Sequence, residues 1–402
     1  MQRIISLRQG LFLTIYIALK PLYLTRSGNM QIADIFLAIF SVYLLFSNYG
    51  KIRLRTPLFG FTVIFTVICA YQAVVNLVWS GIVGKSLMNF SLFYFFNLVA
   101  CVDVFLIGQQ IGLKKLKESL ILGIFFALVV NSIGMLSDAV YRSRSVSFFN
   151  NPNQLGYFAL ICFSFIIFCS KQASKFVTYS IYTMAGWAVI ASSSKAAIVA
   201  LFIMVFIYML VAADKSSTSK FALYIVSLLL IGIIVYLLLY SDIESIKNNK
   251  SVALMRDRIF NMQGENDSDL GDGRGYNRIA ELGYDFLWGM GEGAYKRFES
   301  LSGGEIHSTY ASLLVSYGVI GAAGYALLLT VCMVDKRAFF RNVAILSGPL
   351  MYQITHNGIR NPLVWMLLAS MLYVKVITSD IPEYELIMER ADSDQPRCIL
   401  LR

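Results

Sequence analysis

The residues best suited to chemistry are concentrated in one polar stretch of the chain. Arg274 and Arg278 are four residues apart, Glu292 stands in the glycine-rich GMGEG, and His307 follows in EIHSTY. His307 is one of only two histidines in 402 residues. Arginines can hold a phosphate or pyrophosphate through paired hydrogen bonds, and a histidine can take up a proton near neutral pH. The stretch therefore predicts a transferase site.

Each of these residues also has a purely structural interpretation. On a helix, Arg274 and Arg278 would share one face, but the same pair could be a solvated basic patch at a membrane surface. Glycines around Glu292 allow either close approach to a ligand or a simple turn, and Glu292 could orient His307 or an arginine. His307 stands where an apolar segment begins and could instead cap it. The two arginines upstream favour catalysis.

A second group of polar residues flanks the apolar segments and could bind a substrate. Asparagines are ordinary turn formers that can cap a helix, and a lysine between two apolar helices is either a buried cation or reaches the membrane interface. His356 is a weaker candidate for catalysis than His307. The candidate substrate-binding residues, with Glu292, are Arg142 and Arg144, Asn151 and Asn153 in FFNNPNQLGYF, Lys195 after three serines, and Arg360 in HNGIRNP.

The composition indicates a membrane protein. Hydrophobic residues make up 57% of the chain and charged residues 14%, whereas soluble domains carry about a quarter charged residues. The net charge of +10 is spread in small clusters between apolar segments, so it indicates topology and not a nucleic-acid partner. The six cysteines form no CxxC pair or Cys/His cluster, so we expect no metal and no other cofactor.

Apolar stretches long enough for a bilayer predict an all-α polytopic protein with about twelve transmembrane helices. We divide the chain into nine helices over 1–240, a long and partly helical loop over 241–307, three helices over 308–378, and a tail over 379–402. The predicted helices are 6–24, 31–48, 57–79, 86–108, 118–137, 154–170, 176–193, 195–213, 221–240, 308–334, 341–357 and 362–378.

The basic residues predict the orientation. With the N-terminus inside, the short cytoplasmic segments hold 15 basic residues and the opposite short loops hold seven. Positive charge is retained on the cytoplasmic side, so both termini are expected inside. The long loop, the FFNNPNQLGYF segment, the SSSK turn and the HNGIRNP turn then all lie on the outer face. Four polar segments on one face predict a single site.

The series NPNQLGY, SSSK, GRGYNR, GMGEG, EIHSTY with YGVIG, and HNGIRNP before a tryptophan resembles the Wzy-type O-antigen and capsule polymerases. These are part of a superfamily that includes the O-antigen ligases. The likeness runs from about residue 20 to about residue 365, and each motif is short, but their order makes the resemblance fairly specific. One departure is Lys195, where relatives often have arginine, so a pyrophosphate fork would become a point charge.

The resemblance implies a metal-independent glycosyltransferase of the bacterial inner membrane, similar to the GT-C class. It would join repeat units carried on undecaprenyl pyrophosphate at the periplasmic face, among membrane lipid, and a chain-length regulator is a candidate partner. By the matching motifs, Arg274, Arg278 and His307 would be the catalytic residues, with Glu292 and Arg360 supporting them.

Two alternatives stay open. A ligase would share the fold and the donor but transfer the polymer to the lipid A core, and only the IHST and HNGIRNP motifs lean toward a polymerase. A flippase for the lipid-linked sugar would need charged residues along a pathway through the spans. Its few candidates, Lys20, Asp34 and Asp103, lie near the ends of spans.

Overall fold

The computed structural model describes residues 2–26, 28–47, 54–142, 144–213, 275–294, 297 and 305–379. These residues form helices and turns, with no strand among them. The predicted helix 221–240, Arg274 and the tail from residue 380 lie outside the described residues. The helices before residue 214 are α1 (Gln2–Leu19), α2 (Ile32–Ser47), α3 (Thr56–Val83), α4 (Met88–Tyr141), α5 (Pro152–Cys169), η1 (Ser170–Gln172), α6 (Lys175–Ser192) and α7 (Lys195–Ala213). After it come η3 (Tyr276–Phe286), α12 (Thr309–Met333), α13 (Phe339–Gln353) and α14 (Pro362–Ser379).

Five of the described helices are long and apolar enough to cross a membrane. They are α3, most of α4, α5, α12 and α14, and the shorter α1, α2 and α7 are also apolar. A bilayer core takes about 20 residues of helix, so the chain is a helical, multi-pass membrane protein. Every predicted span that falls on described residues coincides with a helix or half of one. The count of twelve stays a prediction.

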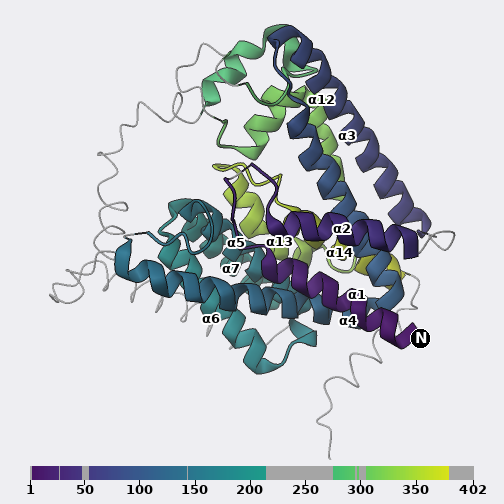
Figure 1. Cartoon of the computed structure of the whole chain (residues 1–402), viewed down its shortest axis with the longest axis vertical. Helices are drawn as coiled ribbons and strands as arrows, with labels where there is room; N and C mark the ends of the chain where they lie inside the picture. The colour runs from purple at the N-terminus through teal and green to yellow at the C-terminus, as the bar shows by residue number, and fades with distance from the viewer. Residues whose placement is uncertain are drawn as a thin grey trace, which may run out of the picture.

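α4 departs from the predicted arrangement. It joins two predicted spans, 86–108 and 118–137, into one element of 54 residues with no loop between them. The backbone leaves the helical conformation only at Gly112, where φ is 77° and ψ is 163°. Glycine adopts positive φ at little cost because it lacks a Cβ atom. The two halves of α4 therefore run in different directions (Figure 1).

The two halves of α4 belong to two groups of helices (Figure 1). The first half runs beside α3. Both α3 and η3 pack against α12. The second half runs along α1, whose Thr14 hydroxyl donates to the Ser119 carbonyl at 3.0 Å. α5 packs with α6, α7 and α13 on that side. α14 contacts α3, α4, α5 and α12, so it joins the two groups.

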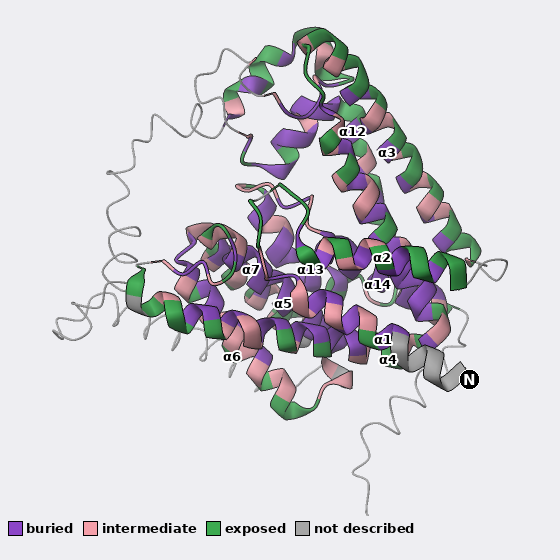
Figure 2. Cartoon of the chain, in the orientation of Figure 1, coloured by how far each residue is buried: buried purple, intermediate pink, exposed green. Residues whose placement is uncertain are grey.

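Burial identifies the centre of the molecule (Figure 2). In their most apolar windows, 83% of α5 and 78% of α14 is buried, against 33% of α3. α3 exposes apolar side chains such as Val67 and Leu77, as expected of a helix that faces lipid. The turn between α13 and α14, residues 354–361, therefore leads into one of the most buried helices.

Caps and tight turns set where the polar segments begin and end. The Asn151 side chain caps α5 by accepting from the Asn153 backbone N–H at 2.8 Å. Ser308 caps α12 in the same way, accepting from Ala311 at 3.3 Å. α6 and α7 are separated by Ser193 and Ser194 alone, which confirms that these helices share almost no loop.

Candidate functional site

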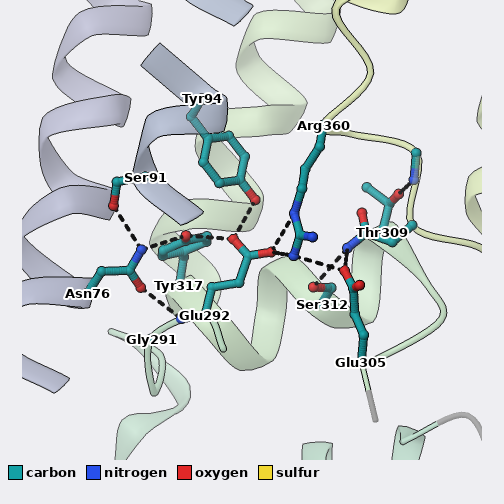
Figure 3. A network of polar contacts seen from close by, with 12 residues as sticks. Asn76, Ser91, Tyr94, Gly291, Glu292, Glu305, Thr309, Ser312, Tyr317 and Arg360 are labelled. Carbon is teal, nitrogen blue, oxygen red and sulfur yellow. Dashed lines mark hydrogen bonds and ion pairs between the residues drawn. The ribbon is translucent and has the colours of Figure 1, made fainter. Parts of the chain in front are cut away.

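The centre of the candidate site is an ion pair between Arg360 and Glu292 (Figure 3). Arg360 donates to one carboxylate oxygen of Glu292 through both Nε, at 3.1 Å, and Nη2. Its Nη2 also pairs with Glu305 at 2.8 Å. The guanidinium lies 5.0 Å from the ring centre of Phe90, a distance suited to a cation–π contact. Glu292 is fully buried, so this arginine supplies the charge partner that a buried carboxylate requires.

The second oxygen of Glu292 is held by two tyrosines (Figure 3). Tyr317 of α12 donates to it at 2.7 Å, and Tyr94 of α4 donates at 3.0 Å. Asn76 of α3 accepts from the Glu292 backbone N–H at 2.7 Å and donates to the Tyr317 hydroxyl at 3.1 Å. Two hydroxyls thus donate to this carboxylate oxygen, and Asn76 holds both the backbone of Glu292 and one of those hydroxyls, which fixes the orientation of the carboxylate.

The glycine-rich loop carries Glu292 to this position by pairing with a break in α12. α12 leaves the helical conformation at Gly318, and the nearby carbonyls of Val315 and Ser316 accept from Met290 and Gly291, both at 2.8 Å. Gly289 has φ of 84°, and a Cβ atom there would lie 2.4 Å from the Tyr317 backbone nitrogen. Only glycine fits, so the GMGEG motif reflects this close approach of two backbones.

A cavity of about 350 Å³, here named the basic cavity, opens on the other side of the 354–361 turn. Of the described residues that line it, two are cations and none is a carboxylate. Arg144 is held in place by donating to the Ser192 carbonyl at 3.0 Å and to the Asn153 amide oxygen at 3.1 Å. The polar residues that line the basic cavity are Arg144, Asn153, Ser194, Lys195, Thr355 and His356.

The two histidines lie near each other. Their ring centres are 6.5 Å apart, and His307 is exposed. His356 stacks on Tyr352 with ring centres 4.5 Å apart, and its Nδ1 lies 3.0 Å from the Thr355 hydroxyl. The start of α12 is tied to the turn because Thr309 donates to the His356 carbonyl at 3.2 Å. One imidazole is therefore fixed at the cavity wall and the other is open to solvent.

The seven predicted substrate-binding residues fall into three sets. Arg144, Asn153 and Lys195 meet at the basic cavity, and Glu292 and Arg360 form the ion pair on the far side of the turn. Two others lie apart from both. Asn151 is an exposed helix cap, and Arg142 is an exposed partner of Asp138 at 3.2 Å, with 56% of its side chain accessible. Helix capping and a surface ion pair are sufficient to explain the contacts of Asn151 and Arg142.

Arg278 departs from both interpretations of the sequence. It is fully buried, so it is not part of a solvated basic patch. The segment that contains it, η3, is a 3-10 helix broken at Gly283 and not an α-helix, so the predicted four-residue spacing does not define a shared face. The Arg278 guanidinium lies against Gly275, which Ile306 also approaches. Arg278 is not among the residues that line the basic cavity. Its predicted partner Arg274 lies outside the described residues.

Four residues of the network were not predicted: Asn76, Tyr94, Glu305 and Tyr317. Asn76 offered a signal, because an asparagine inside an apolar span is costly unless it has partners. Glu305 opens the EIHSTY motif, but in that motif only the histidine indicates chemistry. The tyrosines offered none, since the chain holds 23 and most could serve as packing residues.

These features define a helical, multi-pass membrane protein with a basic cavity and a buried ion pair at one polar turn. Residues 179–326 match the family model Wzy_C, described as O-antigen ligase, which is consistent with the O-antigen polymerase and ligase superfamily. The match covers a little over a third of the chain, from within α6 to within α12. It includes Lys195, Glu292 and His307. The family implies a glycosyltransferase or ligase type of activity. No curated protein matches the chain.

Proposed function

We propose that this protein is a polymerase that joins oligosaccharide repeat units carried on undecaprenyl pyrophosphate into O-antigen or capsular polysaccharide. The observation that carries the proposal is the basic cavity, where Arg144 and Lys195 meet His356 without a carboxylate in the described lining. Two cations in a cavity whose described lining holds no carboxylate suit the negative charge of a diphosphate, whereas a neutral ligand would not need them.

The reaction follows from charge and proton balance. A sugar hydroxyl of one repeat unit forms a bond to the anomeric carbon of another, and the bond from that carbon to the diphosphate oxygen breaks with its electron pair. Arg144 and Lys195 stabilise the charge that develops on the departing diphosphate. His307 accepts the proton of the attacking hydroxyl, and its exposure lets it return that proton to water.

Glu292 and Arg360 position the site in this proposal. Their ion pair holds the 354–361 turn against the glycine-rich loop, and that turn carries His356. Arg278 remains proposed as a third cation for the donor. Because it is buried, donor contact would require the 275–294 segment to move away from α12.

The membrane placement is proposed with the function. Twelve spans with both termini in the cytoplasm put the polar turns and the 241–307 loop in the periplasm, where lipid-linked repeat units would be joined. Helices rich in aromatic and apolar residues, such as the first half of α4, would face the undecaprenyl chain. A chain-length regulator would bind from the same side.

A ligase is the second candidate, and the description of the matching family favours it. A ligase would use the same donor cavity but transfer the polymer to the core sugar of lipid A. The two differ in a deletion strain: loss of a polymerase leaves single repeat units attached to the core, whereas loss of a ligase leaves polymer unattached.

The direct test is elongation of purified lipid-linked repeat units by the purified full-length protein with no second protein present. Polymers of several units are expected, and the purified His307→Ala protein should form them about 10²- to 10⁴-fold more slowly. If the parent protein yields no polymer but transfers preformed polymer to lipid A core, the ligase function replaces the polymerase.

A further inference from the structure

A second cavity, here named the amide cavity, is lined by later residues of the 354–361 turn. It has a volume of about 250 Å³, and the segment between α1 and α2, the first turn of α2, the first half of α4 and the start of α5 also line it. Oxygen and nitrogen atoms of several kinds meet there. Its polar lining includes Lys20, Asn29, Gln31, Asp34, Asn357 and Asn361.

The charges of the amide cavity are paired. Lys20 and Asp34 are joined at 2.5 Å and are nearly buried, and Arg360 pairs with Glu305 at 2.8 Å. The positive charge of Lys20 is balanced by the Asp34 carboxylate. A diphosphate gains little in such a cavity, because no cation there lacks a counter-charge.

The uncharged part of the lining suits hydroxyl groups. Amide side chains both donate and accept, as sugar hydroxyls do. Asn357 donates to Glu305 at 2.8 Å, while its buried amide oxygen accepts no hydrogen bond within the described part of the chain. A buried acceptor without a donor is costly, and a ligand hydroxyl could supply one.

Aromatic rings also line the amide cavity. Tyr23 and Phe149 are in contact, with ring centres 5.1 Å apart, and Phe93 and Phe96 of α4 line the cavity as well. Aromatic faces present a large apolar area with a polar edge, and the C–H face of a sugar ring can pack on them. A lining that holds both amides and aromatic rings matches a ligand with hydroxyl edges and an apolar face.

We propose that the amide cavity binds neutral sugar residues of the repeat unit, while the basic cavity binds the diphosphate. The inference rests on the proposed function for the identity of the sugar. The 354–361 turn separates the two cavities and contributes to both: His356 lines the basic cavity, and Asn357 lines the amide cavity. A substrate bound in both would hold its sugar next to the histidines.

Two probes separate the two cavities in full-length protein held in phosphatidylcholine nanodiscs. The first is the repeat-unit oligosaccharide of the host cell, released from its lipid and fluorescently labelled at the reducing end. The second is undecaprenyl pyrophosphate without sugar. Tyr23→Ala should weaken oligosaccharide binding about 3- to 10-fold, because the stacking face is lost. Tyr23→Phe keeps the ring and should bind within about 2-fold of the parent.

Three further variants control the experiment. Asn29→Ala, in an exposed loop, should weaken oligosaccharide binding about 3-fold with little risk to folding. Tyr179→Ala removes an exposed tyrosine that lines neither cavity and should change nothing. Lys195→Ala should weaken the diphosphate probe alone. Glycerol at the same hydroxyl concentration should not compete with the oligosaccharide.

The outcomes distinguish this inference from the proposed function. The inference is overturned if the oligosaccharide does not bind, if glycerol displaces it, or if Tyr23→Ala and Tyr179→Ala bind it equally. It is also overturned if Lys195→Ala weakens both probes alike, since the sugar would then lie in the basic cavity. If binding depends on Tyr23 but the purified protein forms no glycosidic bond, the sugar site stands and the proposed function fails.

Discussion

The basic cavity and the amide cavity share one turn but treat charge in opposite ways. In the basic cavity, Arg144 and Lys195 face the same space with no carboxylate in the described lining. In the amide cavity, Lys20 is joined to Asp34, and Arg360 to Glu305. A lining with two cations and no carboxylate favours a multiply charged anion, whereas a lining with ion pairs leaves hydrogen bonding and stacking to select the ligand. A count of lysines and arginines alone would not distinguish the two cavities, because each described lining contains one of each.

The largest expected effect concerns the two histidines. His307→Ala should slow polymer formation by about 10²- to 10⁴-fold, because a general base typically contributes that much. His356→Ala removes an imidazole stacked on Tyr352 and should slow it less than about 10-fold. Elongation rates of the purified proteins measure both. If the order is reversed, the histidine on the wall of the basic cavity is the base, and the catalytic centre lies inside that cavity.

The second effect is on stability and tests whether the Glu292 network holds the 354–361 turn that lines both cavities. Arg360→Met leaves the buried Glu292 carboxylate without its cation, which should lower the free energy of unfolding by about 3–5 kcal/mol. Arg142→Met is the matched control, because the Arg142 side chain is 56% accessible and loss of its pair with Asp138 should cost below about 1 kcal/mol. Unfolding in mixed detergent provides the measurement. Equal stability of the two variants would show that the Glu292 network does not hold the turn.

The third effect distinguishes the cavities by ligand charge. Lys195→Ala and Arg144→Ala should each weaken binding of undecaprenyl pyrophosphate by about 10- to 100-fold, because a hydrogen bond to a charged group contributes about 1.5–3 kcal/mol. Lys195→Arg should retain the affinity. Lys114→Ala removes an exposed lysine of α4 that lines neither cavity and serves as the control. Loss of affinity in the control would point to general attraction of the lipid to positive charge.

The sequence predicted the helices well, because a run of apolar residues long enough for a bilayer has few other structures available. It did not predict the continuous α4. The lysines near Gly112 suggested a loop, whereas a single glycine with positive φ changes the helix direction without one. Such a turn depends on which neighbours α4 packs against, and α1 and α3 are distant from it in sequence.

The candidate site was predicted in part. The predicted topology puts the polar turns on one face, and the structure brings Arg144, Lys195 and the start of the 354–361 turn to one cavity. An arginine partner for Glu292 was one of two predicted options, and Arg360 proved to be that arginine. The burial of Arg278 was not predicted, because it depends on the contact of η3 with α12 and not on spacing along the chain.

The smallest effect compares two asparagines of one motif. Asn151 caps α5, while Asn153 accepts from Arg144 at the cavity wall. Asn151→Ala should lower the free energy of unfolding by about 1 kcal/mol and leave diphosphate binding unchanged, since a lost cap affects only the helix end. Asn153→Ala frees the Arg144 guanidinium to leave its position, which should weaken diphosphate binding about 3- to 10-fold with little change in stability. If both variants only destabilise, the motif caps a helix and has no part in the basic cavity. If Asn151→Ala weakens binding at unchanged stability, the cavity extends to the exposed end of α5, and its boundary must be redrawn there.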